Sequence, residues 1–395
     1  MTAIKHNTVN ADWIMDHFMN GQNEHPTDCV ASLPTAGSTL PQKDVEYYQE
    51  TDAEWQKQDV PVSGFKKRKL VLHVDVNNTI LVSDTATEQG TRAALSSYFS
   101  SVIWGKINQL DKWEWLSDVP SVLPPCDEAV NFYSVFGKDE DFFDSTEGRC
   151  FKSIFVDHLQ KLEWPGPADE ILSVTGEDGK QYHRILPSFF WLIKTLCLQG
   201  REFSILLRTM GTDLYPVLHA LEFAMRGGHP QFKDLQMLSF PVNSKTGRIR
   251  CNKREIVLST ETERISTLKD SRSIYQYFNS LSGISGFQDH FDWWARNSYT
   301  GKGGKPFWVD PYDQNIQHVF IDDNIRFTDD YNIVHPLVFT KKGGIQTRTA
   351  PASEFYDCCL IQTDLLNAIA NQDYFIKKIQ QCEEKYDSYL YKLQS

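Results

Sequence analysis

The sequence has no hydrophobic run long enough to cross a membrane, and cysteine is sparse. No stretch of the 395 residues contains the roughly 18 consecutive apolar residues that a transmembrane helix needs. The segment 1–20 contains His, Asp and Asn where a secretory signal peptide would need an apolar run. The eight cysteines include no CxxC pair and no Cys/His cluster at zinc spacing, so we expect reduced thiols. These absences predict a cytoplasmic protein without a membrane partner.

Positive charge is also scarce. The 40 Lys and Arg residues are outnumbered by 52 Asp and Glu residues, which gives a formal net charge of −12. A protein that binds nucleic acid needs a basic face, because neutralising phosphates supplies much of the affinity. We therefore expect no nucleic-acid partner.

Several well-known catalytic motifs are missing. No GxGxxG follows a predicted strand, and neither GxSxG nor HExxH occurs, which excludes dinucleotide-binding, α/β-hydrolase and zincin functions. The glycine-rich run 301–305 ends in a lysine, but Pro306 follows where a nucleotide-binding P-loop would need Ser or Thr. We interpret that run as a flexible turn.

What is present is the composition of a large globular protein. With 395 residues, 41% of them hydrophobic, the chain can form a sizeable core in one elaborated domain or two domains. Residues 1–65 are polar and punctuated by Pro and Gly, which predicts a partly extended N-terminal arm. The first continuous apolar run, Leu70–Val74, predicts a buried strand that opens the core.

Strand and helix patterns alternate in the second half of the chain. Helical patterns at 188–198 and 213–225 flank a strand pattern at 203–207, and another strand is expected at 318–321. This alternation is typical of an α/β protein with a Rossmann-like open parallel sheet. Other expected elements are strands at 236–240 and 337–340, a hairpin of 248–250 with 255–258, helices at 271–282 and 291–297, and one long amphipathic helix near 364–393.

These patterns divide the chain into four parts. We expect the arm at 1–65, an α/β core formed by 66–95 and 185–350, an inserted subdomain at 96–184, and a C-terminal segment at 351–395. The amphipathic helix of the last part has an apolar face that suits docking on the core.

Polar clusters follow three of the predicted strands. They are Asp-Val-Asn-Asn-Thr at 75–79, Arg-Thr-Met-Gly at 208–211 and Asp-Asp-Asn at 322–324. Open parallel sheets bind ligands at the carboxyl ends of their strands, so we expect these clusters to meet there.

The residue types in these clusters suit phosphoryl transfer. A carboxylate such as Asp75 can attack phosphorus and form an aspartyl-phosphate, provided that the phosphate charge is offset. Asp322 could share an octahedral Mg²⁺ site with Asp75. Thr209 would hold a phosphoryl oxygen, and Lys305, with Lys302 as the alternative, would neutralise the remaining charge.

In the types and the order of these residues, the chain resembles the haloacid dehalogenase superfamily over 66–95 and 185–345. That family has a strand followed by DxDx(T/V), a strand followed by Thr or Ser, a lysine, and a strand followed by two acidic residues. The resemblance implies a haloacid-dehalogenase-like core, a phosphatase activity and Mg²⁺ as cofactor. The implied catalytic residues are Asp75, Asn77, Thr209 and Lys305, the substrate-binding residues Thr79, Arg208 and Gly211, and the metal ligands Asp75, Asn77, Asp322 and Asp323.

Asn77 departs from the family pattern, in which a second aspartate at this position is the general acid and base. An amide cannot carry the proton, although its backbone carbonyl could still bind Mg²⁺. We therefore expect the leaving-group step to be slower by the ~10²–10⁴-fold typical of acid–base catalysis. Asp84 and His73 are poor substitutes, and His73 fits better as a packed core residue.

The chain between Asp75 and Thr209 is far longer than one strand-to-strand connection needs. In the family, a cap inserted at this point covers the site and selects small substrates, so the resemblance implies a small phosphorylated metabolite. Aromatic residues of the insertion could line such a lid or simply pack: Trp104, Trp113, Trp115 and Phe132. Basic residues of the expected hairpin could attract a phosphate, although a solvated surface is the simpler interpretation: Lys245, Arg248, Arg250, Lys253 and Arg254.

Two hypotheses of different classes remain open. The first is a Mg²⁺-dependent phosphohydrolase or phosphotransferase with an aspartyl-phosphate intermediate on Asp75. The second is a catalytically impaired relative, or pseudoenzyme, that binds Mg²⁺ and phosphate. It would contact a protein partner through the N-terminal arm or the C-terminal helix.

Overall fold

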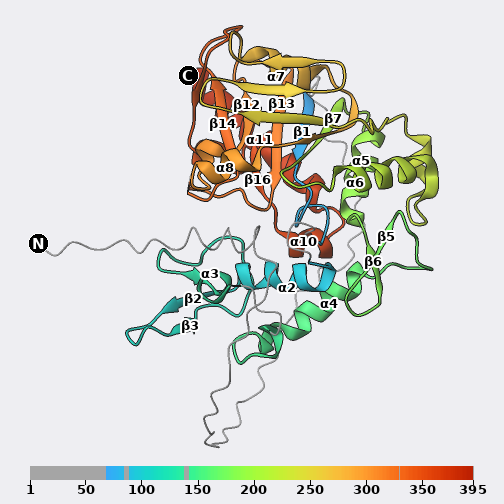
Figure 1. Cartoon of the computed structure of the whole chain (residues 1–395), viewed down its shortest axis with the longest axis vertical. Helices are drawn as coiled ribbons and strands as arrows, with labels where there is room; N and C mark the ends of the chain where they lie inside the picture. The colour runs from blue at the N-terminus through green and yellow to red at the C-terminus, as the bar shows by residue number, and fades with distance from the viewer. Residues whose placement is uncertain (1–67, 84–88, 138–141, 329, 395) are drawn as a thin grey trace, which may run out of the picture. The chain divides into compact units, whose positions relative to one another are not determined.

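The computed structural model (Figure 1) describes residues 68–83, 89–137, 142–328 and 330–394. The N-terminal arm expected at 1–65 lies outside the described residues, and so does Asp84. All described residues belong to one of the two compact units of the chain.

The centre of this unit is an eight-stranded sheet with the order β10-β9-β8-β11-β7-β1-β13-β16. Neighbouring strands from β8 to β16 pair in parallel, whereas β8, β9 and β10 form an antiparallel meander at one edge. The strands are β1 Lys69–Val74, β7 Phe203–Thr209, β8 Gly247–Cys251, β9 Ile256–Ser259, β10 Arg264–Ser266, β11 Gly283–Gln288, β13 Ile316–Asp322 and β16 Leu360–Gln362. A mixed α/β fold with a largely parallel central sheet is therefore confirmed.

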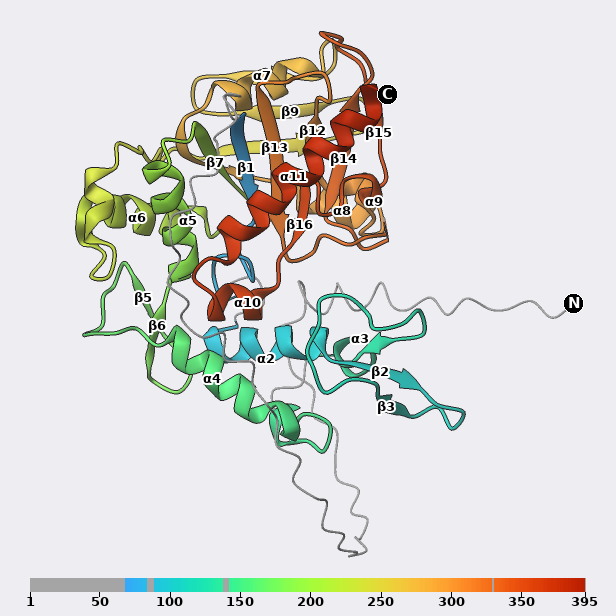
Figure 2. The ribbon, with the colours of Figure 1, turned by 180° about the vertical axis from the view of Figure 1, so that it is seen from behind.

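Both faces of this sheet are covered, which explains why its strands are nearly continuous apolar runs. In β1, Leu70 and Leu72 pack with residues of α5 (Pro187–Leu198) and α11 (Tyr374–Gln394). Val71 points to the opposite face and packs with α7 (Arg272–Ser280) and β12 (Lys305–Val309). Figure 2 shows α11 running across its face of the sheet. The expected docking of the C-terminal helix on the core is confirmed.

The segment between β1 and α5 contains its own small elements. They are α2 Thr91–Val102, β2 Trp104–Ile107, β3 Trp113–Trp115, β4 Val130–Asn131, α3 Phe132–Phe136, α4 Lys152–Leu162, β5 Ser173–Thr175 and β6 Gln181–His183. Tyr98 of α2 ties this segment to the core, because its hydroxyl donates to the carbonyl of Thr363 and accepts from the amide of Leu365. Thr363 in turn donates its amide to the carbonyl of Asp322. The insertion is thus attached close to one of the predicted site residues.

The remaining elements complete the core. They are α6 Leu214–Phe223, α8 Phe291–Arg296, β14 Val334–Phe339, β15 Thr347–Thr349, α9 Ala352–Phe355 and α10 Leu365–Ala370. β12, β14 and β15 form a separate three-stranded sheet. The predicted hairpin is present as β8 and β9, and the helices predicted at 271–282 and 291–297 are present as α7 and α8. Among the described residues, no helix combines the length and apolarity that crossing a membrane requires.

Two predicted elements were wrong. The segment 236–240 is not a strand; a 3₁₀ turn, Lys233–Met237, occupies its start. The long helix predicted near 364–393 is two helices, α10 and α11, because the chain turns at Asn371, whose side-chain oxygen accepts a hydrogen bond from the amide of Asp373.

Candidate functional site

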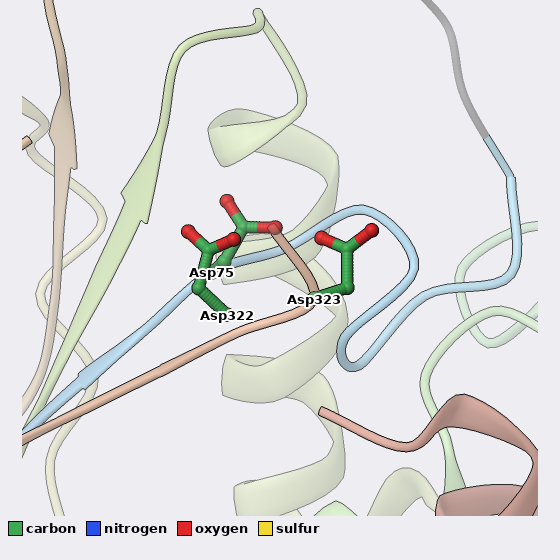
Figure 3. A group of neighbouring side chains, drawn as sticks. All are labelled: Asp75, Asp322 and Asp323. Carbon is green, nitrogen blue, oxygen red and sulfur yellow. The ribbon is translucent and has the colours of Figure 1, made fainter. Parts of the chain in front are cut away.

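Asp75 and Asp322 lie side by side because their strands are parallel neighbours. Val74 pairs with Ile321 at the ends of β1 and β13, and the amide of Asp75 donates to the carbonyl of Ile321 at 2.9 Å. One ligand oxygen from each of Asp75, Asp322 and Asp323 lies within 4.8 Å of the others. Figure 3 shows the three carboxylates gathered where the two strands end. These residues could hold a metal ion.

Lys305 connects the first two carboxylates. Its ammonium group donates to Asp75 Oδ1 at 2.5 Å, to Asp322 Oδ2 at 2.7 Å and to the carbonyl of Arg208 at 3.0 Å. Lys305 is the first residue of β12 and is buried, whereas Lys302 is exposed in a 3₁₀ turn. Of the two lysines considered from the sequence, Lys305 is the one that lies in the cluster.

The electrostatics of the cluster favour an added cation. Burial and the nearby Asp322 raise the pKa of Asp75 to about 7, against the lowering effect of Lys305. Burial, then Asp322 and Asp75, raise the pKa of Asp323 well above its usual range. Burial opposes the charge of Lys305, but Asp322 and Asp75 outweigh it and raise its pKa. The raised pKa values of Asp75 and Asp323 show that the carboxylates repel one another, and a divalent cation would offset this repulsion.

Thr79 bridges the two acidic motifs. Its hydroxyl lies 3.5 Å from Asp75 Oδ2 and accepts a hydrogen bond from the amide of Asp323 at 3.2 Å. The turn that returns Thr79 to this position includes Asn78 with a φ of 53°. Thr79 is fully buried, so its side chain links these two motifs and does not face a substrate.

Thr209 and Gly211 lie next to Asn77 at the end of β7. The hydroxyl of Thr209 accepts a hydrogen bond from the amide of Gly211 at 3.0 Å. A Cβ atom added to Gly211 would lie 3.1 Å from Asp213 Oδ2, and at ordinary contact distances of 3.5 Å from Thr209 Oγ1 and 3.8 Å from Asn77 Nδ2. The close approach at Gly211 is therefore to the carboxylate of Asp213.

Asp213 is a site residue that the sequence did not reveal. Asn77 donates its side-chain amide to Asp213 Oδ2 at 3.1 Å, and Asp213 is buried. In the sequence, this aspartate is the first residue of the predicted helix 213–225 and is indistinguishable from an ordinary residue at a helix start. Because 136 residues separate Asn77 from Asp213 in the chain, their hydrogen bond could not be predicted from the sequence.

Arg208 belongs to a buried network, not to a substrate-binding surface. Its guanidinium makes a two-pronged ion pair with Asp289 at 2.7 and 2.8 Å and also donates to the carbonyl of Pro306. It further donates to His73 Nδ1 at 2.9 Å, so that His73 carries its proton on Nε2 and donates to His318 Nδ1 at 3.0 Å. The substrate-binding role predicted for Arg208 is therefore not supported.

The same contacts explain His73. Burial, with Arg208 and His318 nearby, lowers the pKa of His73 well below its usual value, so the ring is neutral. Its expected role as a packed core residue is confirmed, and its ring nitrogens face Arg208 and His318 instead of the acidic cluster.

The predicted lid and basic residues have varied surroundings. Trp113 packs edge-on against Phe132 with ring centroids 5.5 Å apart, while Trp115 is 43% exposed. In the hairpin, Arg250 donates to the side-chain oxygen of Gln288, whose amide donates to the carbonyl of Gly211. Lys245 pairs with Glu261, and the other three basic residues are on the surface: Arg248, Lys253 and Arg254. Arg250 is thus linked through Gln288 to Gly211 of the site.

Comparisons with protein-family models, curated proteins and solved structures find no match to this chain. The function is therefore inferred from the geometry of the acidic cluster and its surroundings.

Proposed function

We propose that the chain is a Mg²⁺-dependent phosphohydrolase or phosphotransferase that acts on a small phosphorylated substrate through an aspartyl-phosphate on Asp75. The observation that carries the proposal is the buried Lys305 ammonium, shared between Asp75 and Asp322 at the ends of adjacent parallel strands. A nucleophilic carboxylate, a fixed cation and two further carboxylates are the parts that phosphoryl transfer requires.

Each residue has a role in this proposal. Asp75 attacks the phosphorus, and Lys305 offsets charge on the phosphoryl oxygens. Thr209 Oγ1 accepts from the amide of Gly211, which leaves its own proton free to donate to a phosphoryl oxygen. Mg²⁺ held by Asp75, Asp322 and Asp323 would supply Lewis-acid stabilisation of the transferring group.

The proposal includes a haloacid-dehalogenase-like core with a cap. The support is the order of the motifs along the chain and the place of the insertion, which lies between β1 and α5. The hydrogen bonds of Tyr98 attach this insertion beside Thr363, whose amide donates to the carbonyl of Asp322 in the acidic motif.

Asn77 favours a second candidate function, a pseudoenzyme that binds Mg²⁺ and phosphate without turnover. Its amide cannot transfer a proton, and it stands two residues after Asp75, where the resemblance implies the general acid and base. Such a protein would act through a protein partner at the N-terminal arm or the C-terminal helix α11.

Phosphate release with and without Mg²⁺ tests the proposal, with wild type compared with Asp75→Asn over a panel of phosphorylated metabolites. Asp157→Asn is the matched control, because Asp157 is an exposed residue of α4 with a surface partner, Lys161. The enzyme hypothesis expects turnover in wild type and the control, and none in Asp75→Asn. Equal rates in all three proteins contradict it. A folded protein that binds Mg²⁺ and beryllium fluoride without turnover is the pseudoenzyme.

A further inference from the structure

The orientation of the Asn77 side chain is fixed by its neighbour. Only the NH₂ end of an amide can donate to a carboxylate, so the hydrogen bond to Asp213 Oδ2 turns Asn77 Nδ2 toward Asp213 and Oδ1 away from it. Asn77 Oδ1 is buried and has no hydrogen-bond partner among the described residues. Asn77 is therefore held with its donor end on Asp213 and its acceptor oxygen turned away from it, and an amide held in this way cannot protonate a departing oxygen.

The cationic side chains near Asp75 are already engaged. The ammonium of Lys305 has three N–H groups and three acceptors: Asp75, Asp322 and the carbonyl of Arg208. The guanidinium of Arg208 donates to Asp289, His73 and Pro306. In the proposed mechanism Thr209 donates to a phosphoryl oxygen and Asp323 binds the metal, so neither is assigned to the leaving group.

Asp213 is placed as an acceptor. Its Oδ2 atom faces the NH₂ group of Asn77, and a carboxylate in this position accepts a hydrogen bond. We therefore assign Asp213 as a positioning residue that holds the Asn77 amide in one orientation.

We infer that the substrates of this site are phosphate anhydrides, meaning acyl phosphates or phosphoanhydrides, and not alkyl phosphate esters. The inference rests on the proposed function and narrows its substrate class. A carboxylate or a phosphate departs as a stable anion and needs no proton, whereas an alkoxide is strongly basic and depends on an acid. A site with a fixed acceptor at position 77 thus favours substrates whose leaving group is a weak base.

The two steps balance without a general acid. In the first, an oxygen of Asp75 forms a bond to phosphorus, and the bond from phosphorus to the leaving oxygen breaks, with its electron pair departing on the leaving anion. In the second, a water oxygen attacks phosphorus and one of its protons passes to a phosphate oxygen. Dihydrogen phosphate leaves, and the electron pair returns to Asp75.

The experiment measures kcat/KM for acetyl phosphate, pyrophosphate, 4-nitrophenyl phosphate, phenyl phosphate and glycerol phosphate in the full chain with Mg²⁺. Wild type is compared with Asp213→Asn and with the exchange variant Asn77→Asp/Asp213→Asn, which places the carboxylate at 77 and the amide at 213. Binding of beryllium fluoride to each variant verifies that the site is folded. Acetyl phosphate and pyrophosphate distinguish the acyl phosphate from the phosphoanhydride.

The expected result in wild type is a steep decline of kcat/KM from the anhydrides to glycerol phosphate. In the exchange variant, the ratio of glycerol phosphate to acetyl phosphate turnover should rise by ~10²–10⁴-fold, the usual contribution of a general acid. In Asp213→Asn, the ratio of glycerol phosphate to acetyl phosphate turnover should not fall, because Asp213 accepts a hydrogen bond from Asn77 and donates no proton to the leaving group.

Three outcomes overturn the inference and leave the proposed function intact. They are Asp75-dependent turnover of glycerol phosphate at a rate near that of the anhydrides, a selective loss of glycerol phosphate turnover in Asp213→Asn, and an unchanged ratio in an exchange variant that still binds beryllium fluoride. The second outcome would identify Asp213 as the acid. By contrast, the absence of Asp75-dependent turnover with every compound, the anhydrides included, contradicts the proposed function itself.

Discussion

Arg208 and Asp289 form an ion pair in which both side chains are almost completely removed from solvent, with 0% and 1% exposure. The pair joins the end of β7 to the residue that follows β11, and the amide of Asp289 donates to the carbonyl of Thr209 at 2.8 Å. Arg208 also presents its backbone carbonyl to Lys305. The geometry of the acidic cluster is therefore coupled to this buried pair.

Asp289→Asn should destabilise the protein strongly. The substitution leaves the buried guanidinium of Arg208 without a counter-charge, and breaking a buried pair in this way typically costs about 3–5 kcal/mol. Urea unfolding measures the change. Glu261→Gln is the control because Glu261 pairs with Lys245 on the surface, and its unfolding midpoint should change little. Equal effects of the two substitutions would show that the Arg208 pair is not structurally important.

His183 and His229 should each make stability fall as the pH is lowered from about 6.5 toward 4. Burial lowers the pKa of His183 and of His229 from 6.5 to about 4. Between these values, the unfolded chain binds protons that the folded chain rejects, so acid favours unfolding. At about 1.4 kcal/mol per pKa unit, each histidine would contribute up to about 3 kcal/mol.

Urea unfolding at pH 7 and pH 5 measures this dependence. His183→Phe, in a site packed against Trp164, should make the loss of stability at pH 5 smaller. His219→Phe, at an exposed position, should leave the dependence as in wild type. An unchanged pH dependence in His183→Phe would show that His183 is not one of the responsible groups.

Tyr98→Phe should loosen the attachment of the insertion. The substitution removes a buried hydroxyl that bonds to the carbonyl of Thr363 and the amide of Leu365, and an unsatisfied buried polar group costs about 1–3 kcal/mol. Thermal unfolding and amide exchange at 363–365 measure the effect, with the exposed Tyr215→Phe as control. Unaltered exchange at these amides would mean that the insertion is held by other contacts.

Mg²⁺ should stabilise the folded protein against heat. A divalent cation would offset the repulsion among the three carboxyl groups, and a ligand at 100 times its Kd adds about 2.7 kcal/mol to stability. Asp322→Asn should abolish this Mg²⁺-dependent rise in Tm, and Asp157→Asn should retain it. A similar rise in Asp322→Asn would place the metal elsewhere.

The sequence predicted the acidic part of the site because its signals are local. Asp75 and Asp322 each follow a continuous apolar strand, and such strands in a parallel sheet end at the same edge. The structure also distinguishes Lys305 from Lys302, which the sequence could not do. The strand that carries Lys305 is short and contains Pro306, and its weak pattern gave no sign that this lysine is buried.

The parts that the sequence did not predict depend on tertiary contacts. β11 was missed because it contains Gly283 and Gly286, which weaken the strand pattern. A Cβ atom at Gly286 would lie 3.0 Å from a methyl carbon of Leu218, so α6 packs closely against this glycine. Asp213 was missed because its partner, Asn77, is 136 residues away in the chain. The segment 236–240 has apolar residues at strand-like spacing, but the chain at its start is a 3₁₀ turn.

Detection of phosphate on Asp75 tests the proposed aspartyl-phosphate intermediate most directly. The protein is incubated with radiolabelled acetyl phosphate and Mg²⁺, quenched in acid, treated with or without hydroxylamine, and analysed by peptide mass spectrometry. If Asp75 is the nucleophile, a hydroxylamine-labile phosphate is expected on the peptide that contains Asp75, and it is expected to be absent in Asp75→Asn. Label on another residue, or label that persists in Asp75→Asn, would contradict this role of Asp75.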